Sequence, residues 1–209
     1  MKYINKTRFF ILTCIFILLF SFSISYAKNT SAGLADSLVR LHIVANSNAP
    51  ADQKLKLAVR DRLIKETSAI FENPQSPEDA LLSAQNNKDL ISEIAKDEIL
   101  KNGFSYDVNV KIGKFAFPSK AYADIMLPAG KYNAIRIEIG SGSGENWWCV
   151  MYPPLCFTDG IVSISDESRQ MLKENLSNEE YSLITSQSDG AIPVQFKFKI
   201  VEIFQKLFA

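Results

Sequence analysis

Residues 140–157, G-S-G-S-G-E-N-W-W-C-V-M-Y-P-P-L-C-F, form the most distinctive stretch of this 209-residue chain, and they contain both of its tryptophans. Gly142 and Gly144 favour a turn or bulge, because glycine adopts backbone angles that other residues avoid. Residues 147–152 have strong strand propensity. Pro153 and Pro154 end that strand, since proline has no N–H to donate to a neighbouring strand. The stretch therefore predicts a turn, a strand and a proline-braced break, in that order.

The segments before this stretch alternate between apolar and polar residues, as half-buried strands do. The expected strands of this region are residues 106–112, 121–127, 135–139 and 147–152. A tight connection at residues 128–131 predicts an antiparallel hairpin between the second and third of them. Together they predict an antiparallel meander of about four strands.

A further strand is expected earlier, at residues 38–45. Its apolar side chains share one face, and Arg40 and His42 lie on the other. The apolar residues of that face are Val39, Leu41, Ile43 and Ala45.

Helical patterns stand before and after the sheet region. The expected helices are residues 51–71, 77–101, 167–175, 179–185 and 194–208. Ser76 with Asp79, and Ser177 with Glu180, have the spacing of capping boxes, and Asp166 is expected to cap the third helix. On the first helix the charged residues, Lys56 and Arg60 among them, are expected to face solvent. Helices around an antiparallel sheet of four or five strands predict a single α+β domain.

The N-terminus has the layout of a secretory signal peptide. Basic residues precede an apolar run at residues 9–20, and small residues at Ser25 and Ala27 follow it. We expect cleavage between Ala27 and Lys28, which gives a signal peptide over residues 1–27 and one secreted domain over residues 28–209. The alternative is an uncleaved anchor, because the apolar run extended to residue 26 approaches the ~20 residues that span a bilayer. In both cases the domain lies outside the cytosol.

The composition excludes several functional classes. The net charge is zero, and no basic stripe suggests a nucleic-acid partner. Removal of residues 1–27, which carry three basic and no acidic residues, leaves a mature chain of net charge −3. No motif indicates a cofactor, a metal site or a small-molecule substrate. The glycine-rich residues 140–144 lead into a strand, whereas a phosphate-binding loop leads into a helix, so a turn is the better interpretation.

His42 is the only histidine, so it is required by any mechanism that uses an imidazole. The structural interpretation is a partly exposed or hydrogen-bonded strand residue. The functional alternative is a wall-associated thiol hydrolase or transpeptidase, in which His42 activates Cys149 or Cys156 as the nucleophile. No local signature of such an enzyme is present, and two prolines beside Cys156 are unusual for a nucleophile. The residues therefore favour a protein that is not an enzyme.

Cys149 and Cys156 flank the two prolines. In an oxidising compartment they are candidates for a disulfide, which would contribute about 2 kcal/mol because its loop is short. The alternative is a pair of buried, reduced thiols that pack as small apolar groups. A zinc site from both cysteines and His42 matches no compact zinc motif.

Trp147 and Trp148 point to opposite faces of a regular strand. One can fill the core, and the other then needs a cover from a terminal helix or from a partner protein. Packing of these aromatic residues in the core is the favoured interpretation. Use at an interface is the alternative, and it rests on the general enrichment of tryptophan and tyrosine at interaction hot spots.

Two blocks of the chain carry a family resemblance. One is R-L-H-I-V-A-N-S-N-A-P-A-D-Q-K-L-K-L-A-V-R-D at residues 40–61, and the other is G-K-Y-N-A-I-R-I-E-I-G-S-G-S-G-E-N-W-W-C-V-M-Y-P-P-L-C-F at residues 130–157. In this order, behind a signal peptide, they resemble the stage II sporulation protein R family of exported signalling proteins in endospore-forming bacteria. A mild departure is Met151–Tyr152, where another apolar or aromatic pair is expected.

The resemblance implies a function by contact. Such a protein is made in the forespore and secreted across the forespore membrane into the intermembrane space. There it activates a membrane-embedded aspartic peptidase of the mother cell, which processes pro-sigma-E. On this hypothesis the contact surface for the peptidase includes Arg40, His42, Asn146, Trp147, Trp148, Tyr152, Pro153, Pro154 and Phe157. A third interpretation is a structural envelope protein held by an uncleaved anchor.

Overall fold

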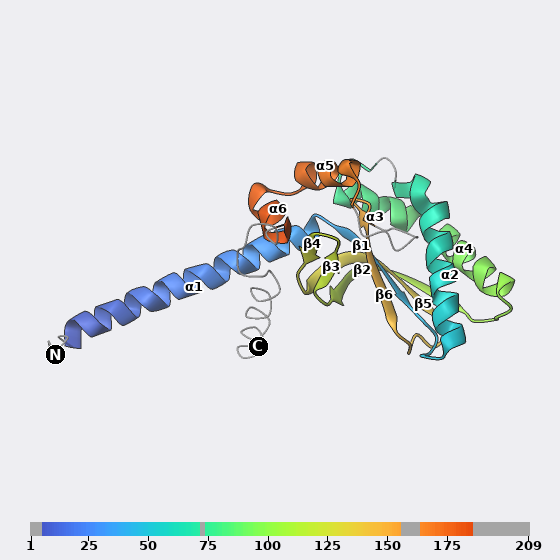
Figure 1. Cartoon of the computed structure of the whole chain (residues 1–209), viewed down its shortest axis with the longest axis horizontal. Helices are drawn as coiled ribbons and strands as arrows, with labels where there is room; N and C mark the ends of the chain where they lie inside the picture. The colour runs from blue at the N-terminus through green and yellow to red at the C-terminus, as the bar shows by residue number, and fades with distance from the viewer. Residues whose placement is uncertain (1–5, 72–73, 156–163, 186–209) are drawn as a thin grey trace.

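A mixed four-stranded sheet forms the centre of the protein, whose computed structural model describes residues 6–71, 74–155 and 164–185 (Figure 1). The strands lie in the order β2-β5-β1-β6. Their bounds are Val108–Phe117 for β2, Gly130–Ile139 for β5, Val39–Val44 for β1 and Asn146–Tyr152 for β6. β1 runs parallel to β5 and antiparallel to β6, while β2 is antiparallel to β5.

The α+β class and the single domain are confirmed, but the predicted meander is wrong. The earliest strand, β1, inserts between β5 and β6 and so contributes one parallel pair. Every residue of β1 is buried, which fits a central strand covered on both faces and not an edge strand.

The predicted hairpin between residues 121–127 and 135–139 is also wrong. Residues 120–127 fold back on themselves as a separate two-stranded sheet of β3, Lys120–Tyr122, and β4, Ile125–Leu127. Ala123 forms the turn with a φ of 51°. β5 pairs instead with β2, whose ten residues match it in an unbroken register.

Helices cover both faces of the sheet. Their bounds are Lys6–Asp36 for α1, Pro50–Thr67 for α2, Pro77–Asn86 for α3, Lys88–Lys101 for α4, Asp166–Asn175 for α5 and Asn178–Thr185 for α6, with a 3-10 helix, η1, at Ser68–Phe71. The single helix expected over residues 77–101 is divided, because Asn87 turns its backbone N–H and its side-chain amide back onto the Ser83 carbonyl. The helix expected at residues 194–208 lies outside the described residues.

Local capping predictions agree with the structure at two helix starts. The Ser76 hydroxyl accepts the Asp79 N–H at 3.1 Å. Ser177 and Glu180 form a reciprocal box, in which each side chain accepts the other residue's backbone N–H. At α5 the cap is Ser165 and not Asp166, because Asp166 is already the first helical residue.

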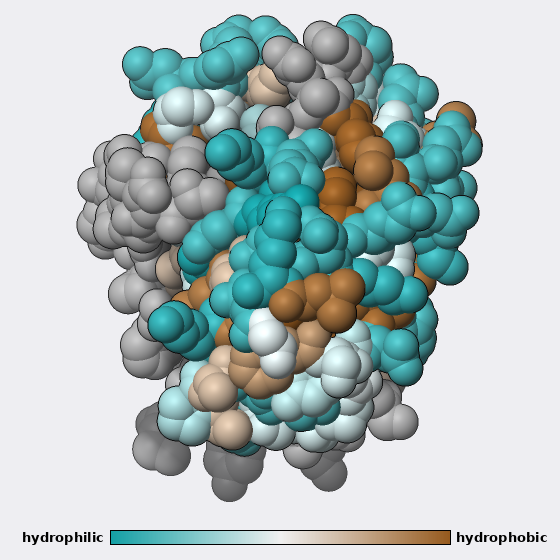
Figure 2. Space-filling model, turned by 90° about the vertical axis from the view of Figure 1, so that its right-hand side faces the viewer, coloured by the Kyte–Doolittle hydropathy of each residue, from teal (hydrophilic) through white to brown (hydrophobic). Residues whose placement is uncertain are grey.

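The sheet separates two hydrophobic cores. On one face, α2, α3 and α4 pack on the apolar residues of β1 and β5, including Leu41, Ile43 and Ile137. On the other face, the end of α1, the β3–β4 hairpin, α5 and α6 pack around Phe117, Tyr132 and Val150. Seen from the side of α2 and α4, the surface is mainly hydrophilic, with hydrophobic atoms in separate strips (Figure 2).

α1 extends away from the domain, and only its last turns pack on the core (Figure 1). Leu34 is fully buried and Ala35 is nearly so, whereas the side chains from Phe9 to Phe20 are largely exposed. Within the described residues, no helix reaches both the length and the apolarity of a bilayer-spanning segment. Signal cleavage after Ala27 stays a prediction.

Candidate functional site

The two sequence blocks that carry the family resemblance lie side by side in the fold. β1 and the start of α2 come from the first block, and β5 and β6, the two neighbours of β1, come from the second. Residues about 90 positions apart in the sequence therefore form one continuous surface and one shared loop region.

The glycine-rich loop between β5 and β6 clamps the loop that follows β1. The Asn46 side-chain oxygen accepts the Ser141 N–H at 3.0 Å, and the Asn46 carbonyl accepts the hydroxyls of Ser141 and Ser143 at 2.6 and 2.8 Å. Gly140 and Gly142 have φ angles of 57° and 59°. A side chain at Gly140 would also collide with Asn46. The expected turn is confirmed, and the polar groups of Ser141 and Ser143 form hydrogen bonds with Asn46 of the same protein.

Asp52 joins this clamp to the start of α2. Its carboxylate accepts the Ser47 hydroxyl at 2.6 Å and the Asn46 amide at 2.8 Å. The side chain is almost fully buried. The hydrogen bonds from Ser47 and then Asn46 lower the pKa of Asp52, because they favour the ionised form. The carboxylate is thus a structural anchor of the loop.

The face of the sheet opposite α2–α4 carries a row of polar and aromatic side chains across all four strands. The strand register places Lys111 beside Arg136, Arg136 beside His42, and His42 beside Trp148. The next row towards the glycine-rich loop holds Asn109, Glu138, Val44 and Asn146. We call these two rows the open half of the face, because most of their side chains are partly or fully exposed. The core around Phe117 and Tyr132 begins at the next row, which contains Arg40.

His42 is the most buried polar residue of the open half. Its Nε2–H donates to Asn146 Oδ1 at 2.6 Å, and its ring stacks on Trp148 with centroids 5.8 Å apart. Only 5% of the residue is exposed. Burial is the main cause of its lowered pKa, which the Asn146 hydrogen bond opposes, so the ring is neutral at pH 7. The hydrogen-bonded strand histidine is therefore confirmed, although the residue is more buried than a polar strand face suggested.

Arg40 is a fully buried cation in an aromatic surrounding. Its guanidinium carbon lies 4.1 Å from the centroid of the Phe117 ring and 4.7 Å from that of Tyr132. Nη2 donates to the Tyr122 hydroxyl at 2.7 Å, and that hydroxyl donates to the Trp148 carbonyl at 3.2 Å. Nε and Nη1 find no hydrogen-bond partner in the part of the chain that the structure describes. Arg40 thus ties the β3–β4 hairpin to β1 without a carboxylate, and the Tyr122 hydroxyl ties the same hairpin to β6.

The pKa values of Tyr122 and Tyr132 reflect the buried surroundings that both residues share with Arg40. Burial raises the pKa of both phenols, against the opposing effect of the Arg40 charge. Both hydroxyls stay protonated at neutral pH, and Tyr132 donates to the Pro128 carbonyl at 2.7 Å. They serve as neutral hydrogen-bond groups.

Trp147 points to the other face of the sheet, as alternation along the strand predicted. The Arg60 guanidinium lies 4.2 Å from the centroid of its ring. Arg60 is 8% exposed and Lys56 is 4% exposed, so the expectation of a solvated charged face on this helix is wrong for these two residues. Lys56 Nζ donates to Gln53 and to the Glu145 carbonyl, which is why it points inward.

The end of β6 is also built into the core. Tyr152 is buried in the core under α2–α4, and its hydroxyl donates to Asn175 Oδ1 at 3.0 Å. Pro153 follows a cis peptide bond and is buried, whereas Pro154 is exposed and its carbonyl accepts the Ser168 hydroxyl. Phe157 lies outside the described residues.

Six of the nine residues expected at a partner surface are therefore divided between two faces of the sheet. Arg40, His42, Asn146 and Trp148 come together on the open side, and Trp147 and Tyr152 lie on the opposite side. Sequence analysis missed Lys111, Arg136, Glu138 and Lys120. Alternation places the first three on outward strand positions, but only the strand order brings them beside His42.

The structure does not pair His42 with Cys149. Cys149 packs in the core under α2–α4, on the face opposite His42, and it is disulfide-bonded. Cys14 is free, and Cys156 lies outside the described residues, so the Cys149–Cys156 pairing stays a prediction. Across residues 6–71, 74–155 and 164–185, no group of three histidine, cysteine or acidic side chains could hold a metal.

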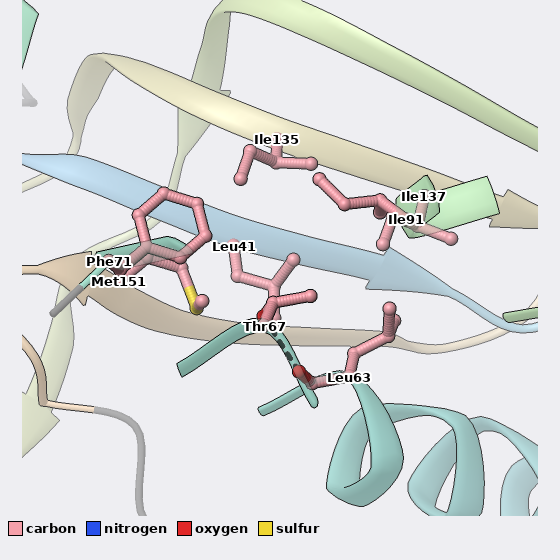
Figure 3. Close-up of a pocket in the computed structure, with 8 residues that line it drawn as sticks. All are labelled: Leu41, Leu63, Thr67, Phe71, Ile91, Ile135, Ile137 and Met151. Atoms are coloured by element: carbon pink, nitrogen blue, oxygen red, sulfur yellow. Dashed lines mark hydrogen bonds between the residues drawn. The ribbon is translucent and has the colours of Figure 1, made fainter. Parts of the chain in front are cut away.

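A small pocket lies beneath the helices, away from the open half, and Figure 3 shows the side chains around it. Its lining is apolar apart from the Thr67 hydroxyl, which donates to the Leu63 carbonyl at 2.7 Å. The pocket is lined by Leu41, Leu63, Thr67, Phe71, Ile91, Ile135, Ile137 and Met151. Without an ionisable group, it is a packing gap of the core.

Comparison with known proteins gives a matching family model and a curated relative. The family model described as stage II sporulation protein R matches residues 35–162, more than half of the chain. The stage II sporulation protein R of Bacillus subtilis (strain 168) is 39% identical over 133 residues, which cover 64% of this chain and 59% of that protein. The chain thus matches less than two thirds of the length of this curated relative. No solved structure matches it. The matched region contains the whole sheet, the clamp loop and the open half, and the chain belongs to the stage II sporulation protein R family.

Proposed function

We propose that this protein is an exported signalling protein of endospore formation and not an enzyme. It is secreted from the forespore into the intermembrane space and activates, by contact, a membrane-embedded aspartic peptidase of the mother cell that processes pro-sigma-E. Family membership supports a sporulation role. The separation of His42 from Cys149 supports a ligand over a thiol enzyme.

The observation that carries a contact role is the row Lys111–Arg136–His42–Trp148. It joins a half-buried tryptophan to a hydrogen-bonded, neutral imidazole on a surface that the described helices leave open. Such an aromatic group on a rigid sheet loses little conformational freedom on binding, and binding energy concentrates on tryptophans of this kind. To activate the peptidase, the surface must bind its active state more tightly than its inactive state.

The test replaces Trp148 with alanine in a strain that lacks the endogenous gene. We expect wild-type protein to restore pro-sigma-E cleavage and Trp148→Ala to reduce it at least about tenfold, since truncation of a hot-spot tryptophan costs roughly 2 kcal/mol or more. Leu57→Ala on α2, an exposed residue of the opposite side, is the matched control and should restore cleavage fully. Cleavage is followed by immunoblot, at equal amounts of each exported protein.

Two results would contradict the proposal in different ways. If the wild type failed to restore cleavage, activation of the peptidase by this protein would be refuted. Full activity of a folded Trp148→Ala protein would remove the open half as the contact surface.

A further inference from the structure

The open half of the sheet face has an excess of positive charge. Lys111 and Arg136 both pair with the single carboxylate of Glu138, at 2.8 and 2.9 Å. Lys120 lies at the edge with its Nζ 5.9 Å from the centroid of the Trp148 ring, and it makes no ion pair within the described residues. Among the described residues of the open half and this edge, the one carboxylate of Glu138 thus faces three cations, Lys111, Arg136 and Lys120.

Arg40 adds to this excess from below. It is fully buried one row away from His42 and Trp148, and no carboxylate among the described residues pairs with it. A buried charge is screened less by solvent and salt than an exposed one. Its positive potential therefore reaches the surface above it, where a negatively charged group of a partner would be stabilised.

The remaining features of this surface indicate what kind of anion it suits. Glu138 stands between the cations, so a membrane surface with closely spaced phosphates would bring like charges together there. Trp148 contributes aromatic area beside these charges, and Arg136 lies 5.7 Å from the centroid of the Phe115 ring, which packs against the adjoining core. Separate carboxylates alternating with apolar side chains match this pattern better than a continuous layer of phosphates.

We propose that the open half binds an acidic segment of the partner protein, with carboxylates facing Lys111, Lys120 and Arg136 and an apolar side chain packed on Trp148. This inference rests on the proposed function for the identity of the partner, the peptidase. It adds the chemistry by which the partner is recognised.

The experiment uses the full-length chain in sporulating cells and a photo-reactive phenylalanine at position 146. Asn146 is exposed and borders Trp148, so a bound segment would lie within reach of the probe. Because the probe removes the hydrogen bond from His42, Asn146→Phe must first be shown to restore pro-sigma-E cleavage. The same probe at position 57, on α2, is the control for random capture. Mass spectrometry identifies the adduct and the peptide that carries it.

Charge reversal then tests the recognition. Lys120→Glu should lower both the adduct at position 146 and pro-sigma-E cleavage roughly tenfold, because a like charge opposes the bound carboxylates. Lys54→Glu makes the same charge change at an exposed position of α2 and should leave both unchanged.

Each outcome decides the inference. An adduct on a peptide with several Asp or Glu residues that Lys120→Glu weakens and Lys54→Glu does not would support it. An adduct on a neutral or basic peptide, a lipid adduct, equal behaviour of the two charge variants, or no adduct specific to position 146 would overturn it. If the wild type fails to restore cleavage, the peptidase proposal fails, and the acidic-segment inference is judged by the adduct and its loss in Lys120→Glu.

Discussion

Asn46→Ala should destabilise the protein far more than its position in a surface loop suggests. The Asn46 side chain joins the loop after β1 to α2 and to the glycine-rich loop, through Asp52 and Ser141. Alanine would keep the backbone carbonyl, and with it the hydrogen bonds from Ser141 and Ser143 hydroxyls. Only the two side-chain bonds are therefore removed.

The magnitude follows from these two bonds. The amide donates to the buried Asp52 carboxylate at 2.8 Å, and a hydrogen bond to a charged group contributes about 1.5 kcal/mol or more. The side-chain oxygen accepts the Ser141 N–H at 3.0 Å in an exposed setting, where a neutral bond contributes about 1 kcal/mol or less. Together they predict a loss of about 2–3 kcal/mol in the free energy of unfolding.

Urea unfolding of the purified protein measures this loss. With a slope of about 2 kcal/mol per molar urea, the midpoint should fall by about 1 M. Asn48→Ala, an exposed asparagine of the same loop, is the matched control and should stay within about 0.5 kcal/mol of the wild type. If Asn46→Ala also stayed within that limit, the clamp would not hold the two loops together, and the reasoning would be refuted.

Two further predictions concern the buried cation and the histidine. Arg40→Met should change the free energy of unfolding by less than about 2 kcal/mol, because removing the cost of burying a charge offsets the lost hydrogen bond to Tyr122. Arg40→Ala should lower the free energy of unfolding by about 3 kcal/mol, because it also leaves a cavity. Equal losses for the two variants in urea unfolding would contradict this account. Because the pKa of His42 is lowered in the folded protein, the unfolded chain binds a proton at this residue at a higher pH than the folded chain does. The contribution of His42 to stability is therefore fully present above pH 6.5 and falls as the pH drops below that value. His42→Gln should flatten stability against pH just below 6.5, and an unchanged slope there would show that another group is responsible.

Features with local causes agreed well between sequence and structure. The capping boxes at Ser76 and Ser177 need residues only three positions apart, so the chain specifies them wherever the helix lies. The turn at residues 140–144 likewise follows from its glycines, two of which adopt positive φ. Two local predictions were wrong. Asn87 divides α3 from α4 by bonding back to Ser83, and α5 is capped by Ser165 and not by Asp166.

Features set by distant partners were not accessible from the pattern alone. Alternation correctly placed Arg40 and His42 on one face of their strand, but it could not show that this strand is central and that both are buried. The same alternation in residues 121–127 was compatible with pairing to β5, whereas the tertiary structure pairs these residues with each other. The candidate site depends on this point, since Lys111 meets His42 only through Arg136 of the intervening strand.

By itself, the sequence determined the capped helix starts at Ser76 and Ser177, the four strand segments of the main sheet, the α+β class and the family blocks. These features depend on neighbours within a few positions and on the order of residues. Only the tertiary structure decided the strand order, the burial of Arg40 and the row that ends at Trp148. The physical reason is that a strand's alternation states which side chains share a face but not which strand lies beside it. That choice is made by packing among residues about 90 positions apart, here by the insertion of β1 between β5 and β6.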